Sequence, residues 1–338
     1  MKEPKTLQEA ILYFADADRC IAYLAESRWP DGVAVCPTCG RTDVSYVPKR
    51  RVWQCKSRHP KCQFSIKVGT IFEDSPIPLS KWLAAMWLIA NCKNGISSWE
   101  IHRALKVTQK TAWFMLHRVR LVMKDERDHK FGFGGPVEVD ECFIGPKPEK
   151  MHRKRKAKLQ MQQTLGLRTD SYVGKTAVQG VLDRYYRQIR TKVLPDVKRE
   201  TLQNTILDNV TPFAKVYTDE AVQYDKLDKN FIHKVVNHMQ EYVNGQVHTQ
   251  GIDNYWSLLK RTLRGTYIAV EPFHLSRYLD EQAFRYNNRA TKDNPLNDGD
   301  RFAVMVAQIL GRRLTYNELT GKTAANEGDA RQDEAEQF

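Results

Sequence analysis

Four cysteines near the N-terminus have the residue type and the spacing of metal ligands. Cys36 and Cys39 form a C-x2-C pair in the stretch CPTCG, and Cys55 and Cys62 follow within the next 23 positions. Two thiolates at the tip of a tight turn can share one tetrahedral Zn²⁺ at about 2.3 Å, and a neighbouring hairpin would supply the other ligands. His59 lies between Cys55 and Cys62 as a rival fourth ligand. We favour Cys62, with His59 as the alternative.

The zinc ligands of such a site would be structural. Small buried thiols are the alternative, but Pro37, Gly40 and the many surrounding basic residues make a poor core. A segment this short buries little apolar surface and needs a metal to hold it together. The chain has seven cysteines and no export signal, so its thiols are expected to stay reduced. A zinc with four protein ligands is closed and does no chemistry.

Three acidic side chains in the second half could hold a different kind of metal. Asp140 lies in the alternating stretch GPVEVDECFIG, Asp219 ends the short stretch AKVYTDE, and Asp253 lies in HTQGIDNYWSLLKR. Mg²⁺ prefers carboxylate oxygens. Two such ions, about 3.5 to 4 Å apart, stabilise the attacking and the leaving oxygen of phosphodiester transfer. A single Asp on a helix is more often a solvated residue, and Asp253 keeps this alternative. The nearby His248 either contacts phosphate or caps the helix.

The elements that must position these carboxylates form one mixed α/β unit. In the first strand Val137, Val139 and Glu141 alternate with Glu138 and Asp140, so Asp140 and Glu141 point to opposite faces. A carboxylate in the middle of a strand is costly unless something pairs with it. Strands are expected at 175–184, 187–194, 214–220 and 231–238, and helices at 199–210 and from about Gln250 to Leu263. This order fits a ribonuclease-H-like fold.

A pair of helices that could bind DNA precedes this unit. The stretch NGISSWEIHRALKVTQKTAWFMLHRVRLVM contains two amphipathic helices with a short connection, which is the layout of a helix-turn-helix. A plain helical hairpin that packs its tryptophans is the alternative. If the second helix faces DNA, the contacting side chains are expected to be Gln109, Lys110, His117, Arg118 and Arg120.

The bulk composition agrees with a polyanionic partner. Among 338 residues, 53 Lys and Arg exceed 40 Asp and Glu, giving a formal net charge of +13. Cationic surfaces gain free energy by releasing counterions from phosphates, although a generic basic surface would give the same count. The longest apolar run, Trp82 to Ala90, is about half the length that spans a bilayer. We therefore expect neither secretion nor a membrane segment.

Composition and motifs together divide the chain into five segments. The basic run from Lys147 to Lys158 is expected to be a solvated loop that can contact a phosphate backbone, and the acidic end of the chain is expected to be disordered. The expected segments are an N-terminal helical segment (1–28), a zinc ribbon (29–70), a helix-turn-helix-like DNA-binding segment (77–127), a ribonuclease-H-like catalytic domain (133–292), and a C-terminal helix with the acidic tail (293–338).

The motifs taken together resemble a known family. VEVDECFIG, VYTDE, HTQGIDNYWSLLKR and YLDEQAFRYNNR, preceded by CPTCG and FSIKVGTIFEDSPIPLSKW, resemble the DDE-type transposases of a bacterial insertion-sequence family with an N-terminal zinc ribbon. The resemblance covers roughly residues 29–289. It implies that Asp140 and Asp219 are the first two catalytic aspartates. It also implies that Asp253 occupies the third acidic position, usually Glu, and that Lys260 is the basic residue seven positions later.

The resemblance also implies an activity. It predicts an insertion-sequence transposase that binds element ends and catalyses metal-dependent DNA nicking and strand transfer, with two Mg²⁺ (or Mn²⁺) ions and a structural Zn²⁺. Its partners would be the double-stranded DNA of terminal inverted repeats and target, on which it acts as a homodimer or larger assembly in the bacterial cytoplasm. Lys260 and the adjacent Arg261 would contact that DNA. The alternatives are a catalytically inactive or domesticated DNA-binding protein and a metal-dependent nuclease without strand transfer.

Overall fold

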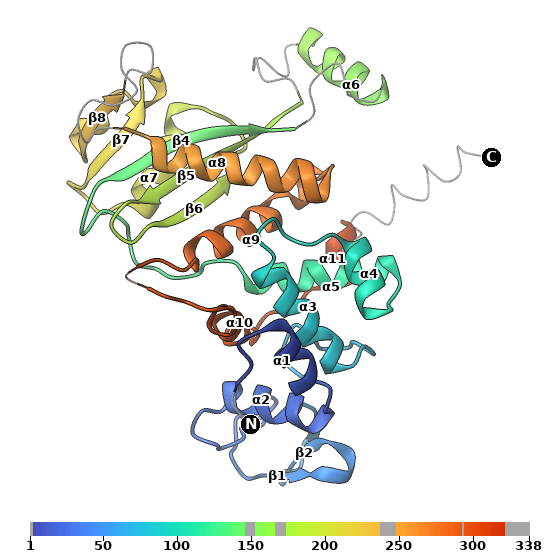
Figure 1. The fold of residues 1–338 in the computed structure, drawn as a ribbon. Coiled ribbons are helices and arrows are strands. Elements are labelled where there is room, and N and C mark those ends of the chain that lie inside the picture. Colours follow the sequence, from blue (N-terminus) through green and yellow to red (C-terminus); the bar gives the residue numbers. More distant parts are fainter. Residues whose placement is uncertain (1–2, 146–152, 166–173, 237–247, 293, 322–338) are drawn as a thin grey trace. The chain divides into compact units, whose positions relative to one another are not determined.

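A computed structural model of the chain describes residues 3–145, 153–165, 174–236, 248–292 and 294–321. The chain divides into two compact units, one formed by residues 1–124 with 288–338 and the other by residues 125–287 (Figure 1). The described residues from 288 onward therefore belong with the N-terminal unit, which the sequence patterns did not indicate. None of the described helices has the length and apolar character needed to cross a membrane.

The first unit begins with two helices and a small antiparallel sheet. Its elements are α1 (Leu7–Tyr13), α2 (Ala17–Arg28), β1 (Val44–Val47), the 3-10 turn η1 (Pro48–Arg50), β2 (Val52–Cys55) and β3 (Gln63–Phe64), with strand order β1-β2-β3. Thr6 and Glu9 form a capping box that begins α1. Trp53 stacks on Phe64 and meets Trp29 edge-on. This aromatic cluster gives the small sheet a core of its own.

Helices complete the first unit. They are α3 (Leu79–Asn91), α4 (Ser98–Leu105), α5 (Gln109–Val122), α10 (Asp298–Val306) and α11 (Tyr316–Thr320). Ser97 and Glu100 form a capping box at the start of α4, and the Thr108 side chain caps α5. Each cap begins its helix, and the short connection between α4 and α5 agrees with the predicted pair of helices. Phe302 of α10 packs on Trp87 of α3 with ring centroids 5.1 Å apart.

The second unit is built on a five-stranded mixed sheet. Its strands are β4 (Val137–Ile144), β5 (Thr176–Asp183), β6 (Gln188–Val193), β7 (Lys215–Asp219) and β8 (Ile232–Val236), in the order β6-β5-β4-β7-β8. The β4–β5 and β5–β6 pairs are antiparallel, whereas β4–β7 and β7–β8 are parallel. The predicted fold class, a zinc ribbon followed by a ribonuclease-H-like mixed sheet, is confirmed.

Helices cover both faces of this sheet. They are α7 (Arg199–Asn209), α8 (Gln250–Thr262) and α9 (Leu275–Asn287), with short helical turns η3 (Val222–Tyr224), η4 (Leu227–Lys229), η5 (Leu263–Tyr267, of π type) and η6 (Pro272–His274). Val139 of β4 packs with Ile206 of α7 in one apolar core. Cys142 of β4 packs with Trp256 of α8 and Leu279 of α9 in the other. Because the side chains of β4 point alternately to the two faces of the sheet, they contribute to two separate cores.

The basic run between β4 and β5 corrects one prediction. The sequence predicted a solvated loop from Lys147 to Lys158, but α6 (Arg153–Thr164) is a helix. Arg, Lys, Ala, Leu, Met and Gln are all strong helix formers, so local propensity outweighs the repulsion between like charges. Residues 147–152 of the run, and the acidic tail from 323, lie outside the described residues.

Candidate functional site

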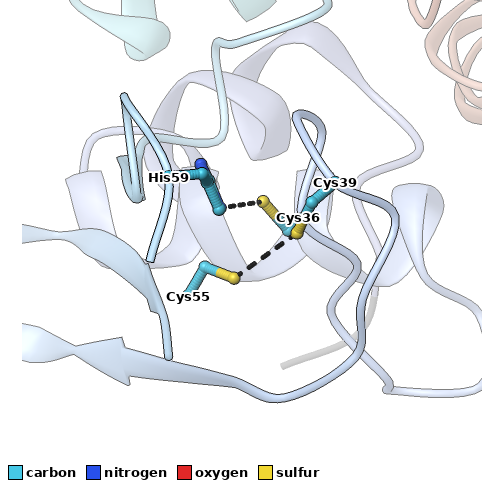
Figure 2. A group of neighbouring side chains, drawn as sticks. All are labelled: Cys36, Cys39, Cys55 and His59. Atoms are coloured by element: carbon cyan, nitrogen blue, oxygen red, sulfur yellow. Dashed lines mark hydrogen bonds between the residues drawn. The ribbon is translucent and has the colours of Figure 1, made fainter. Parts of the chain in front are cut away.

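The cysteine cluster brings four possible metal ligands together. One ligand atom from each of Cys36, Cys39, Cys55 and His59 lies within 4.8 Å of all the others (Figure 2). The Cys36 Sγ lies 3.5 Å from the His59 Nε2, and the Cys39 Sγ lies 3.7 Å from the Cys55 Sγ. Gly40 has φ +71°, a left-handed conformation that glycine adopts without strain and that closes the C-x2-C turn. The group has the size and donor set of a tetrahedral zinc site.

The fourth residue of this group is not the one that the sequence favoured as a ligand. The clustered fourth residue is His59, and Cys62 is not part of the group. The Cys55 amide donates to the Cys62 carbonyl at 2.8 Å, so both residues belong to the base of the β2–β3 hairpin. His59 lies in the loop between them, and the longer imidazole reaches the knuckle while its Nδ1 contacts the Pro60 carbonyl at 2.7 Å. We therefore replace Cys62 by His59 as the proposed fourth ligand.

The electrostatics of this group favour a metal-binding thiolate at Cys55. A hydrogen bond with His59 lowers the pKa of the Cys55 thiol to about 6. The Pro60 carbonyl, and then Cys55, raise the pKa of His59 to about 9. The thiolate is the form of cysteine that binds metal, and it is therefore present at neutral pH. A bound zinc ion would take the place of the proton on the His59 imidazole, beside the Cys55 thiolate.

The helix α5 presents few of its predicted DNA-contacting side chains. His117, Arg118 and Arg120 are buried, with exposed fractions of 0%, 6% and 1%. Arg118 donates to the carbonyls of Ile71 and Leu314, at 3.0 Å each. These three residues were predicted to contact DNA, and the prediction is corrected, because a buried side chain cannot reach a phosphate or a base edge. The helical spacing gave no sign of which face the rest of the unit would cover.

Two of the predicted residues lie at the start of α5. Lys110 is exposed and its Nζ lies 4.7 Å from the centroid of the Tyr316 ring. Gln109 is partly buried and donates to the Ser98 Oγ at 2.9 Å, which ties the two helices together. Trp99 on α4 was not singled out by the sequence, yet its side chain is 58% exposed. The accessible surface of this helix pair therefore lies at α4 and the first turn of α5.

Asp140 and Asp219 lie level with each other on neighbouring strands. Val137 pairs with Val216 and Glu138 with Tyr217 in the parallel β4–β7 register, an offset of 79 residues. The same offset separates Asp140 from Asp219, which is the last residue of β7. Side chains at matching positions of adjacent parallel strands point to the same face. The two carboxylates thus lie at one edge of the sheet, where β4 and β7 stop pairing.

Helix α8 packs directly over Asp140. The indole Nε1 of Trp256 donates to the Asp140 Oδ2 at 2.9 Å. Opposite Asp140 on β5 lies Gly180, and a Cβ added there would meet the Trp256 ring at 2.7 Å and Ile252 at 3.0 Å. The missing side chain at Gly180 therefore makes room for the indole that holds the Asp140 carboxylate. The sequence gave no indication of this hydrogen bond.

The charges of the three aspartates act on one another. Burial, together with the carboxylates of Asp219 and Asp253, raises the pKa of Asp140 to about 6. The Trp256 hydrogen bond opposes that rise. Mutual repulsion of this kind is relieved by a bound cation, so the carboxylates are suited in charge and in donor type to a divalent metal ion.

Asp253 and Lys260 lie on α8, and both are exposed. The Thr249 Oγ1 contacts the Asp253 Oδ2 at 3.5 Å. The Lys260 charge opposes the rise that burial causes in the pKa of Cys142, which places Lys260 beside β4. Among the described residues, the three aspartates do not bring their oxygens within the 4.8 Å that joins the cysteine group. Their arrangement is that of separate carboxylates around a shared edge.

Glu141 points to the opposite face from Asp140, as the strand alternation predicted. Its Oε1 accepts hydrogen bonds from the Tyr224 hydroxyl and, at 3.5 Å, from the Gln179 Nε2. Burial, together with the charges of Asp140 and Asp219, raises the pKa of Glu141 to about 8. Glu141 therefore lies behind the candidate site and does not line it.

A buried carboxylate two residues before Asp140 was the residue that the sequence undervalued. Glu138 is 1% exposed, its Oε1 accepts from the Arg184 Nε at 2.5 Å, and its Oε2 accepts from the Ile252 amide at 2.7 Å. Arg184 also donates to the carbonyl of His248. The signal was present in the sequence, because an acidic residue inside a strand needs a partner, but the partner itself could not be identified there.

Fold and site together define the class of protein: a zinc ribbon joined to a ribonuclease-H-like unit with acidic residues at one sheet edge. A family model described as the ISXO2-like transposase domain matches residues 132–287, and one described as the transposase zinc-ribbon domain matches residues 15–64. The chain therefore belongs to the DDE-type insertion-sequence transposases that carry an N-terminal zinc ribbon.

Individual relatives agree with this assignment. The chain is 28% identical over 258 residues to an uncharacterized protein in transposable element ISH50 of Halobacterium salinarum, covering 74% of this chain and 84% of the relative. It is 34% identical over 106 residues to an uncharacterized transposase-like protein of Haemophilus influenzae, covering 31% and 85%. A chain in the structure of the simian T-cell lymphotropic virus intasome with PP2A regulatory subunit B56 gamma matches with TM-score 0.26 and 9% identity, over 54% of this chain and 63% of that one. That last likeness is too weak to carry an argument.

Proposed function

We propose that this transposase binds the ends of its insertion sequence and catalyses DNA nicking followed by strand transfer. The observation that carries the proposal is the level position of Asp140 and Asp219 on adjacent parallel strands, with Asp253 on the helix that packs over Asp140. Hydrolysis would break the bond between phosphorus and the 3′ oxygen at an element end. The freed 3′-hydroxyl would then attack a phosphorus of the target strand and displace its 3′ oxygen.

The proposed metal ligands are Asp140, Asp219 and Asp253. Mg²⁺ or Mn²⁺, when bound, would stabilise the attacking and leaving oxygens of phosphodiester transfer. The fit is supported by the donor type and by the pKa of Asp140, which burial, together with the charges of Asp219 and Asp253, raises to about 6. Trp256 would keep the Asp140 carboxylate turned toward the edge that it shares with Asp219.

The charged end of α8 is proposed to hold the DNA backbone. Asp253 and Lys260 are seven residues apart, which places them on one stripe of the helix two turns from each other. Both side chains are exposed, as is Arg261. Lys260 and Arg261 would bind phosphates near the scissile bond, while Asp253 binds metal.

Recognition of the element ends is assigned to the first unit. The zinc ribbon and the α4–α5 pair would contact the terminal repeats, with Lys110 and the exposed side chains of α4 as the accessible part. The formal net charge of +13 supports binding to a polyanion. Two ends must be brought together for strand transfer, so we propose a homodimer or larger assembly on paired ends.

The test is an end-joining assay with a matched pair of variants. The purified full chain, Asp140→Asn and Asp208→Asn are each incubated with a labelled duplex that carries the terminal repeat, in Mg²⁺ or Mn²⁺. Asp208 lies on α7 with its side chain 69% exposed, so its variant controls for the loss of one carboxylate. We expect nicked and joined products from the parent and Asp208→Asn, and none from Asp140→Asn.

Other outcomes separate the alternatives. End-specific binding without cleavage in either metal would contradict the proposal and indicate a catalytically inactive DNA-binding protein. Nicking without joined products would indicate a metal-dependent nuclease. Equal products from the parent and Asp140→Asn would refute the assignment of the site.

A further inference from the structure

Helix α8 runs along β4 in matched steps. Ile252 meets Glu138 through its amide, Trp256 meets Asp140 through its indole, and Lys260 meets Cys142 through its charge. The helix positions are four residues apart, which is about 6 Å along a helix at 1.5 Å per residue. The strand positions are two apart, which is about 6.6 Å at 3.3 Å per residue. The two elements therefore stay in step over these three contacts.

The first of these contacts caps the helix from outside. The first amides of a helix have no partner within it, and the residue before α8, Thr249, makes no side-chain capping bond. The Glu138 Oε2 takes the Ile252 amide at 2.7 Å, from a strand 114 residues earlier. A carboxylate at a helix N-terminus is also favoured by the helix dipole. Glu138 thus supplies in space the cap that the local sequence lacks.

The surroundings of Glu138 are shaped for this contact. A Cβ added to Gly251 would lie 2.9 Å from the Glu138 Oε2, so glycine lets the carboxylate approach the helix. Arg184 binds the other carboxylate oxygen and the carbonyl of His248, which precedes the helix. A buried ion pair adds little to stability compared with apolar side chains of similar volume, but it can fix one arrangement among several.

We propose that Glu138 is a positioning residue for the transposition chemistry. By capping α8 and pairing with Arg184, it locks the first turn of the helix in register with β4 and so sets where Asp253 stands relative to Asp140. Asp253 lies one residue beyond Ile252, so a loosened first turn moves its carboxylate directly. This inference rests on the proposed function, in which Asp140 and Asp253 hold metal.

A first experiment measures how firmly the first turn of α8 is held, and it does not depend on DNA cleavage. Hydrogen exchange of the full chain is followed by mass spectrometry on peptides from the first turn of α8. In Glu138→Gln the amide group has one acceptor where two are needed, so either Arg184 or Ile252 loses its partner. We expect exchange of the first turn to rise by about tenfold or more. The control Glu281→Gln removes another buried, arginine-paired carboxylate, on α9, and should leave this turn unchanged.

A second variant, Gly251→Ala, tests the capping role in a case where helix propensity and the carboxylate contact predict opposite changes in exchange. Alanine favours a helix over glycine, so Gly251→Ala should slow exchange in α8 if helix propensity alone decides. If the carboxylate contact decides, the added methyl group displaces Glu138 and exchange becomes faster. Slower exchange in Gly251→Ala, or unchanged exchange in Glu138→Gln, would overturn the capping role.

Kinetic measurements test whether the position of α8 on β4 affects catalysis. For Glu138→Gln we expect the maximal rate of nicking to fall by about 10- to 100-fold, as for other residues that orient metal ligands. The Mg²⁺ concentration for half-maximal rate should rise, while the KM for DNA stays near that of the parent. A changed KM with an unchanged maximal rate would refute positioning. If the parent itself does not cleave, the proposed function fails, and the exchange result still decides whether Glu138 caps α8.

Discussion

The replacement of Gly180 by alanine tests how α8 is seated on the sheet. Gly180 lies opposite Asp140, and its φ is not in the left-handed region, so alanine can adopt the same backbone. The added Cβ would lie 2.7 Å from the Trp256 Cζ2, 2.9 Å from its Cη2 and 3.0 Å from the Ile252 Cδ1. Trp256 is 3% exposed and bonded to Asp140, so it has little room to move.

Two opposing magnitudes decide the sign. Alanine in a strand is about 0.5–1 kcal/mol more favourable than glycine, because glycine loses more conformational freedom on folding. Overpacking a well-packed core costs about 1–3 kcal/mol. We therefore expect Gly180→Ala to lower the free energy of unfolding of the second unit by about 1 kcal/mol. The rate of nicking should fall by about tenfold or more, because a displaced indole loses the Asp140 carboxylate.

The assay is urea-dependent hydrogen exchange of β5 peptides together with the end-joining assay. The chain has two compact units, so exchange of one strand reports on its own unit where a global signal would mix both. Gly265→Ala is the matched control, since nothing lies within 4 Å of its Cβ position. It should leave stability unchanged or raise it by up to about 1 kcal/mol. A Gly180→Ala protein as stable as the parent would refute the packing argument.

Four further predictions concern the zinc site, two residues of α5 and pH. Zinc analysis of purified variants should give one ion per chain for Cys62→Ser and loss of the ion for His59→Ala; the reverse result would restore Cys62 as the ligand. Lys110→Ala should weaken binding to terminal-repeat DNA and reduce its salt dependence by about one counterion. By contrast Arg118→Ala, which abandons buried carbonyls, should destabilise the first unit by roughly 2–4 kcal/mol in thermal unfolding. The His233 ring hydrogen-bonds the Thr218 hydroxyl, and burial lowers the pKa of His233. The contribution of neutral His233 to the stability of the fold is therefore complete above pH 6.5, and it is lost as the pH falls through the lowered pKa of the folded state. Urea unfolding at pH 7.5 and pH 5 should therefore show a smaller loss of stability on acidification for His233→Gln than for the parent.

Local sequence determined the elements of this protein and much of its chemistry. The C-x2-C spacing indicated a zinc knuckle, and the two amphipathic helices with a short connection correspond to α4 and α5. The alternation around Asp140 predicted a strand with Glu141 on the opposite face. Such features depend on residues a few positions apart, so the local sequence is enough to indicate them.

Tertiary structure decided which of these residues face one another. The burial of Arg118 depends on carbonyls 47 and 196 positions away, and the bond from Ile252 to Glu138 spans 114 positions. His59, and not Cys62, lies in the cysteine group because the hairpin loop that carries His59 bends back to the knuckle. Contacts of this kind depend on packing between segments that no local pattern relates. The sequence therefore determined which side chains could bind metal or DNA. The fold decided which of these side chains lie where a metal ion or DNA can reach them.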